Sequence, residues 1–451
     1  MRHRTAIVPM VMALTAIGAS AAGAVSWHRP PFAVTPFPQP ADDPQLAAAP
    51  SGAVAFVWEG WTGAHWRIQT RSRGPRGGLT TTLGLSPAGV DAEDPRLAIS
   101  PDGSTSVIWK NMRSWNRRVQ IRTKRPGGAF GPTQTLSGGR ADATEDRIAA
   151  GPQGQVAVAW AFGRAGRRAV QFRERPAGGQ FEPVRTISPS GGGEIDPQIA
   201  YGPDGTVTVT WELATGRDSI AYARIRRPNA PFGQIIPLSL PQGRASDVMI
   251  ATDPVTGVAT VVWERVTGEG VCIQSRTVTP DGHLGPIQDL SGISRHASDA
   301  DIAVAPDGTT TVLWEIDFTN RDMKTTQSRT RAAGASEWGP VETLTRRAWN
   351  SAREATAPDV DDPVVAVSPD GTFAAVWKQN SAQGVRVQAR IRPPGGPWAA
   401  PQWLSAPLRE ADEPRVTESA QGVFSVIWKL ATGAQVVPEQ NFGLQAVQTR
   451  R

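Results

Sequence analysis

One tryptophan recurs along most of the chain at nearly constant spacing, and this repeat constrains the fold more than any other feature. Successive copies are separated by 51, 51, 51, 52, 51, 63 and 51 residues, and an acid stands 14 to 16 residues before each. The pairs are Asp43 and Trp58, Asp94 and Trp109, Asp146 and Trp160, Asp196 and Trp211, Asp247 and Trp263, Asp299 and Trp314, Asp362 and Trp377, and Glu413 and Trp428. This period predicts eight copies of one structural unit.

The second unit shows the pattern within one copy. Short segments rich in Val, Ile, Thr and Trp predict strands at 97–100, 105–109, 119–123 and 133–136. Between the first two, Pro101-Asp102-Gly103 is typical of a tight turn. Four strands in a repeat of about 51 residues are typical of a propeller blade. We therefore predict an all-β, eight-bladed β-propeller of four-stranded blades over residues 25–451.

The eighth unit contains only three predicted strands before Arg451. Near the other end, Trp27 occupies the place that Trp398 has in its unit, with Phe32 as the alternative anchor. We expect residues 25–39 to supply the missing fourth strand. This strand would close the ring and cover sheet edges that otherwise favour aggregation.

Residues 1–24 have the parts of an export signal. Arg2, His3 and Arg4 form a basic start, residues 6–17 are apolar, and Ala22-Gly23-Ala24 suits a cleavage site. We expect a secreted, extracellular protein. Attachment to a membrane through an uncleaved leader is the alternative.

Composition excludes several kinds of site. A single cysteine, Cys272, excludes a disulfide framework and a cysteine zinc site, and the five histidines lack metal-binding spacing. We therefore predict no metal site from these residue types and no cofactor. The net charge is +6, but the basic residues are dispersed, so we expect no nucleic-acid partner. A monomer is expected.

The repeat resembles known families. Its Asp-x-Pro start and its Ser100-Pro101-Asp102-Gly103 turn are similar to the WD40-like repeats of TolB-type β-propellers. The Val-x-Trp and Gln-x-Arg strands resemble secreted bacterial repeat proteins, and sialidase propellers are a more distant likeness. The sialidase pattern Ser-x-Asp-x-Gly-x-Thr-Trp does not occur in this sequence. The resemblance implies a propeller fold and transfers no catalytic residue.

Residues present in every unit are expected to be structural, because packing between units requires repeated contacts. We expect the eight tryptophans to form the core. A third-strand arginine is also periodic and should link neighbouring units: Arg71, Arg122, Arg173, Arg224, Arg276, Arg329, Arg390 and Arg450. We expect the repeated acids to accept backbone N–H groups in the turn entering each first strand. A cation or basic partner at the mouth of the central channel is the alternative.

Differences between units are the better guide to function. Loops between second and third strands should share one face with the acids, and this face also receives the insertions at 346–361 and 431–444. Aromatic and basic residues there suit sugars and acidic groups. The predicted ligand-binding residues are Trp61, Trp66, Arg113, Trp115, Arg117, Arg118, Arg164 and Trp349.

The leading functional hypothesis is an exported binding module for a glycan, an acidic polymer or a protein partner. The first alternative is a glycan-active hydrolase of sialidase-like propeller type. Such an enzyme requires paired carboxylates, for which the candidates are Glu59, Asp317, Asp322 and Glu354. The second alternative is a structural scaffold without ligand.

Overall fold

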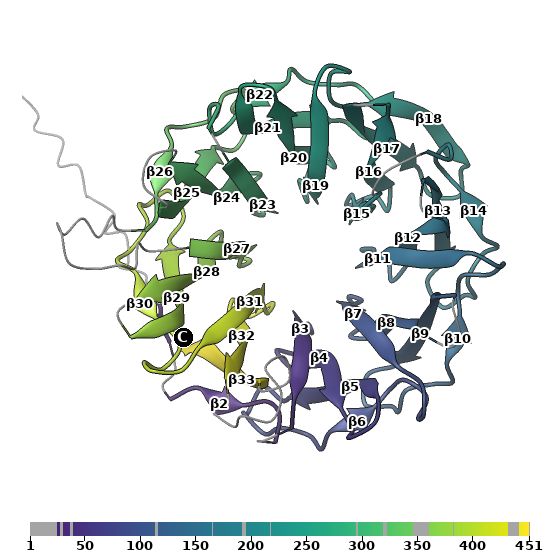
Figure 1. Ribbon diagram of the computed structural model, residues 1–451, viewed down its shortest axis with the longest axis vertical. Helices are drawn as coiled ribbons and strands as arrows, with labels where there is room; N and C mark the ends of the chain where they lie inside the picture. The colour runs from purple at the N-terminus through teal and green to yellow at the C-terminus, as the bar shows by residue number, and fades with distance from the viewer. Residues whose placement is uncertain are drawn as a thin grey trace, which may run out of the picture.

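A computed structural model describes residues 25–27, 30–36, 39–112, 116–164, 166–191, 195–216, 218–294, 296–318, 323–345, 360–381, 383–431 and 442–450. These residues form strands and turns and include no helix, so none of the described segments is a helix that could span a membrane. Figure 1 shows the sheets arranged in a ring.

Each unit contributes strands in a fixed order, from the ring axis outward (Figure 1). The first strands are β3 (Ala41–Ala48), β7 (Ala92–Ile99), β11 (Asp142–Ala150), β15 (Gln198–Tyr201), β19 (Arg244–Thr252), β23 (His296–Val304), β27 (Val360–Val367) and β31 (Ala411–Glu418). The second strands are β4 (Val54–Trp61), β8 (Thr105–Asn111), β12 (Val156–Arg164), β16 (Val207–Thr215), β20 (Ala259–Thr267), β24 (Thr310–Phe318), β28 (Phe373–Ser381) and β32 (Phe424–Ala431).

The third strands are β5 (Trp66–Arg73), β9 (Arg118–Lys124), β13 (Arg167–Arg175), β17 (Asp218–Arg226), β21 (Gly270–Val278), β25 (Met323–Arg331), β29 (Gly384–Arg392) and β33 (Phe442–Arg450). The outer strands are β6 (Leu83–Gly84), β10 (Gln134–Thr135), β14 (Arg185–Thr186), β18 (Phe232–Pro237), β22 (Gln288–Asp289), β26 (Glu342–Thr343) and β30 (Gln402–Trp403), with β1 (Ser26–Trp27) and β2 (Phe32–Ala33) in the last unit.

The predicted all-β propeller is confirmed, with a difference in how the sheets are divided. Strand pairing within each unit is antiparallel, but the described strands form seven sheets. Units four and five share one eight-stranded sheet, because Ser219 of β17 and Arg244 of β19 form a single parallel bridge. Each of the two units therefore keeps its own strand order, although one sheet extends across the boundary between them.

The N-terminal segment joins the last unit, as predicted. Trp27 pairs with Thr449 and Phe32 pairs with Ala446, so both expected anchors contact β33. The backbone N–H of Val34 donates to the carbonyl of Leu444 at 2.8 Å, and the Val34 side chain is fully buried. The two ends of the described chain thus belong to one sheet.

The repeated tryptophans lie in the core between successive units. All eight are 0% or 1% exposed. Trp109, for example, packs in one cluster with Val57 and Ile68 of the preceding unit. Their predicted structural role is confirmed, and burial of these large rings supplies much of the packing between units.

The third-strand arginines also connect units. The Nε atom of Arg122 donates to the carbonyl of Gly131 at 2.7 Å, and a terminal nitrogen donates to the carbonyl of Leu85 in the preceding unit at 3.2 Å. Arg173 makes the same pair of bonds, to Glu182 and Leu136. One guanidinium thereby satisfies two carbonyls on adjacent sheets.

The repeated acids lie inside the first strands rather than in the turns before them. In unit two, β7 begins at Ala92, and its pairing shifts register between Glu93 and Arg96. Asp94 in this bulge has a φ of 53°, a left-handed value that Asp tolerates better than most residues. The acids with positive φ are Asp43, Asp94, Glu145, Asp247, Asp299, Asp362 and Glu413.

Two predicted members of this acid series require correction. In unit three the bulge position is filled by Glu145, and the predicted Asp146 is the next residue, with only 2% exposure. In unit four β15 begins at Gln198, and Asp196 does not have a positive φ. In unit three the spacing itself indicates the shift, because Glu145 stands 15 residues before Trp160, as Asp94 does before Trp109. In unit four it does not, because Asp196 keeps the 15-residue spacing.

Candidate functional site

The bulge acids meet a second repeated position at each junction between units. This position directly follows the core tryptophan, and its residues are Glu59, Lys110, Ala161, Glu212, Glu264, Glu315, Lys378 and Lys429. Because side chains alternate along a strand, this residue points to the opposite sheet face from the tryptophan. We call these residues and the adjoining first-strand acids the carboxylate belt. Sequence reasoning named Glu59 but missed the repeated position, although Glu or Lys follows seven of the eight tryptophans.

Lysines in the belt join neighbouring units through ion pairs. The ammonium of Lys378 lies 3.1 Å from Asp361 and 3.4 Å from Asp362 in its own unit. It also lies 2.9 Å from Asp412 in the next unit. One cation therefore balances several carboxylates that would otherwise repel each other.

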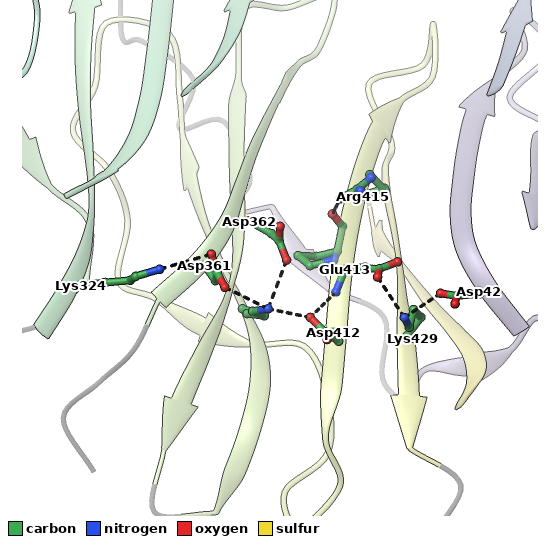
Figure 2. Close-up of polar contacts among 10 residues, drawn as sticks. Asp42, Lys324, Asp361, Asp362, Asp412, Glu413, Arg415 and Lys429 are labelled. Atoms are coloured by element: carbon green, nitrogen blue, oxygen red, sulfur yellow. Dashed lines mark hydrogen bonds and ion pairs between the residues drawn. The ribbon is translucent and has the colours of Figure 1, made fainter. Parts of the chain in front are cut away.

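Lys429 acts in the same way, whereas Lys110 pairs within its own unit. Lys429 of the last unit lies 2.9 Å from Glu413 and 2.7 Å from Asp42 of the first unit (Figure 2). Lys110 of the second unit contacts Asp94. The cations at these junctions are supplied by the chain itself.

The remaining junctions contain other residues after the tryptophan. At the third, Ala161 leaves this position without charge, and Arg147 of the first strand pairs with Asp196 at 2.7 Å. At the fourth and fifth, burial and neighbouring carboxylates raise the pKa values of Glu212 and Glu264 to about 8. Acids with such pKa values are largely protonated at neutral pH.

The first junction combines three acids. Oε1 of Glu59 accepts the backbone N–H of Asp94 at 2.6 Å. One carboxylate oxygen each from Asp43, Glu59 and Asp94 lies within 4.8 Å of the others. Burial, together with the charges of Asp43 and Asp42, raises the pKa of Glu59 to about 9. Glu59 thus carries a proton at neutral pH and can donate a hydrogen bond.

A pair of tryptophans lies beside this group of acids. Trp61 ends β4, Trp66 begins β5, and the two residues are direct cross-strand partners. Their ring centroids are 5.5 Å apart at an angle of 56°, and both side chains are half-buried. Glu59 and Trp61 are two residues apart on one strand, so they share a sheet face. We call Trp61, Trp66, Glu59, Asp43 and Asp94 the first-junction site.

The turn between the two tryptophans is held to the next unit. Oδ1 of Asp91 accepts the backbone N–H of Trp66 at 2.9 Å and lies 3.3 Å from Nδ1 of His65. The backbone N–H of Trp61 donates to the carbonyl of Pro40, directly before β3. The second loop of unit one therefore lies on the same face as the acids, which is the arrangement we predicted.

The other predicted ligand residues are distributed differently. Nε of Arg117 lies 2.7 Å from Glu93, and Arg118 donates to the carbonyl of Ala141 at 2.7 Å. Arg164 is exposed at the end of β12, two units from the tryptophan pair. Arg113, Trp115 and Trp349 lie outside the described residues. Of the predicted ligand residues, Trp61 and Trp66 therefore lie together, whereas Arg117 and Arg118 bind other residues of the protein.

Among the predicted candidate acids, only Glu59 lies in the belt. Asp317 is half-buried on β24, opposite Lys324 of β25. Asp322 and Glu354 lie outside the described residues. Glu59 is also not unique to its unit, because Glu212, Glu264 and Glu315 occupy the same repeat position.

Comparisons with solved structures agree with the architecture. The Dos1 propeller matches with a TM-score of 0.51 and 9% identity, covering 93% of this chain and 94% of that one. A polysaccharide lyase, an ulvanlyase, matches with a TM-score of 0.47 and 9% identity over 91% and 93%. Penicillium chrysogenum α-L-arabinanase matches with a TM-score of 0.40 and 10% identity over 67% and 92%.

These similarities extend to the fold alone, because sequence identity is too low to transfer a function. No protein-family model matches the sequence, and a search of curated proteins finds no match. The chain is therefore an all-β protein with the fold of a β-propeller.

Proposed function

We propose that the protein is an exported carbohydrate-binding module whose ligand binds at the first-junction site. The observation that carries this proposal is the half-buried Trp61–Trp66 pair on the same sheet face as Glu59. Indole rings stack on the apolar faces of sugars, and carboxylate oxygens accept hydrogen bonds from sugar hydroxyls. The protonated Glu59 adds a donor to this set of acceptors.

The proposed location follows from a difference between units. The residue three positions after the core tryptophan forms other pairs in other units, for example Gly163 with Arg168, Val266 with Val271, and Asp317 with Lys324. Unit one instead has two tryptophans at this place, and Trp61 lies on the same sheet face as Glu59. The repeated positions are mainly structural, whereas Trp61 and Trp66 of unit one are residues suited to binding a ligand.

A glycan-active enzyme is the second candidate, and the carboxyl groups favour it. A general acid must keep its proton at neutral pH, which the raised pKa of Glu59 provides. Asp43 and Asp94 supply neighbouring carboxylates. Paired carboxyl groups on either side of a glycosidic bond are the basis of glycoside hydrolysis.

A glycan array combined with a product assay separates the candidates. The full chain should retain at least one glycan on the array, and incubation with that glycan should release no product if the protein only binds. Product that disappears in Glu59→Gln would favour the enzyme. If the protein binds no glycan on the array, both candidates are contradicted, and a structural scaffold is favoured.

Export is a separate part of the proposal and rests on the signal-like residues 1–24. Expression of the full chain in a secreting host should give a mature protein whose N-terminus is Val25. An N-terminus at Met1 in the membrane fraction would favour the uncleaved leader.

A further inference from the structure

A second group of three acids lies at the junction between units six and seven. Asp299 occupies the bulge of β23, Glu315 follows the core Trp314 on β24, and Asp361 lies on β27. One carboxylate oxygen of each lies within 4.8 Å of the others. This group is distant in sequence from the first-junction site and shares no residue with it.

Glu315 is the buried member of the group. It is only 3% exposed, and its Oε1 atom receives Lys324 at 2.8 Å and the hydroxyl of Ser298 at 3.0 Å. Its Oε2 atom is also buried and has no hydrogen-bond partner among the described residues. A buried carboxylate oxygen that accepts no hydrogen bond is unfavourable, so this atom is available to a cation.

The next junction shows which kind of ligand these positions accept. Lys378 follows its core tryptophan as Glu315 follows Trp314, and its ammonium lies among Asp361, Asp362 and Asp412. The repeat therefore holds a cation between first-strand acids at this place. In the junction of units six and seven, the same position contributes a carboxyl group instead of an ammonium group.

Charge balance leads to the same conclusion. Lys324 approaches Glu315 from β25 and lies 3.8 Å from Asp361, so it offsets part of the local charge (Figure 2). The carboxylates of the two junctions, which are Asp299, Glu315, Asp361, Asp362 and Asp412, exceed the two ammonium groups of Lys324 and Lys378. An additional cation would remove this repulsion.

We propose that Asp299, Glu315 and Asp361 bind a divalent cation, with Ca²⁺ as the preferred ion. All three supply hard oxygen ligands, and water would complete the coordination shell. Ca²⁺ accepts irregular arrangements of six to eight oxygens, whereas Mg²⁺ requires near-ideal octahedral geometry. The ion would connect units six and seven as Lys378 connects units seven and eight.

Calorimetric titration of the full, chelator-treated chain with CaCl₂ tests this site directly. Saturable binding is expected in the wild type, together with a higher melting temperature in calcium. Glu315→Gln keeps the side-chain shape and should weaken binding about tenfold or more, because a ligand charge is lost. Asp299→Asn, at an exposed side chain, should have the same effect without disturbing the core.

Glu269→Gln is the matched control, since this exposed acid lies in the turn between β20 and β21, and it should bind calcium like the wild type. Absence of binding at millimolar calcium would overturn the proposal. So would unchanged affinity in both Glu315→Gln and Asp299→Asn. Binding that is lost in Glu59→Gln but kept in Glu315→Gln would place the ion at the first-junction site and also refute this assignment.

Discussion

Replacing Lys429 with methionine should destabilise the ring at the junction where the last unit meets the first. The ammonium lies 2.7 Å from Asp42 and 2.9 Å from Glu413, and its side chain is only 11% exposed (Figure 2). Methionine retains most of the apolar stem and removes the charge. The substitution therefore isolates the electrostatic part of the contact.

The expected loss lies closer to that of a buried ion pair than to that of a surface pair. Breaking a buried pair costs about 3 to 5 kcal/mol, whereas an exposed pair contributes about 0 to 1 kcal/mol. Lys429 is mostly buried and contacts acids of two units, but it retains some contact with water. We expect the free energy of unfolding to fall by about 3 kcal/mol.

The pH dependence provides a second criterion. Burial lowers the pKa of Lys429, but the hydrogen bond that its ammonium donates to Asp42 and the charge of Glu413 outweigh burial, so the pKa is raised above 10.5. The stabilisation is therefore fully present below pH 10.5 and is lost only as the pH rises through the folded-state value. The loss in Lys429→Met should be equal at pH 7 and pH 9.

Urea unfolding of the full chain measures this loss, with Lys124→Met as the control. Lys124 lies over the ring of Phe130, 5.5 Å from its centroid, rather than between carboxylates. Its replacement should change stability by less than about 1 kcal/mol. Equal losses in the two variants, or a loss below 1 kcal/mol in Lys429→Met, would refute the role assigned to belt lysines.

Further stability predictions concern the core, the closure and a buried acid. Trp211→Ala should lower the free energy of unfolding by about 3 to 5 kcal/mol, because the ring is fully buried; urea titration measures this. A chain starting at Ala41 should melt at a lower temperature and aggregate, because the pairs made by β1 and β2 are lost, and unchanged melting and light scattering would contradict this. Burial raises the pKa of Glu418 to about 7, so the folded state binds its proton more tightly than the unfolded state. Stability should therefore fall by up to about 3 kcal/mol as the pH rises from 4.5 to 7, and Glu418→Gln should remove this difference in urea titrations across that range.

The sequence was sufficient to predict the repeat, the strand content and the closure. A tryptophan every 51 residues is visible because the same packing problem recurs at each junction. Trp27 and Phe32 could be assigned to the last unit because a propeller with an incomplete blade needs a partner strand. Such features depend on periodicity, which a single sequence displays directly.

The positions that depend on local register were harder to predict. Asp94 was expected in a turn, but it lies in a bulge, because one extra residue can be inserted without breaking the strand. Asp146 was placed one position too far along, although Glu145 has the same 15-residue spacing to its tryptophan as Asp94. The bridge between Ser219 and Arg244 also has no periodic signal, since it occurs at one boundary among the described strands.

The candidate site was predicted in part. Trp61 and Trp66 stood out because they interrupt the repeat, and their pairing follows from hairpin geometry. The link between Glu59 and Asp94 could not be derived, because it joins residues of different sheets through a side chain and a backbone N–H. Arg117 and Arg118 looked available for a ligand, but their partners in neighbouring strands occupy them.

The affinity of tryptophan variants for an array-selected glycan tests the proposed binding site most directly. Trp61→Ala and Trp66→Ala should each weaken binding about fivefold or more, since a lost aromatic stacking contact costs about 1 kcal/mol or more. Trp403→Ala is the matched control, because this half-buried tryptophan lies on the outer strand β30 against Arg386. Its affinity should equal that of the wild type. Unchanged binding in Trp61→Ala and Trp66→Ala, or an equal loss in Trp403→Ala, would contradict a carbohydrate site at the first junction.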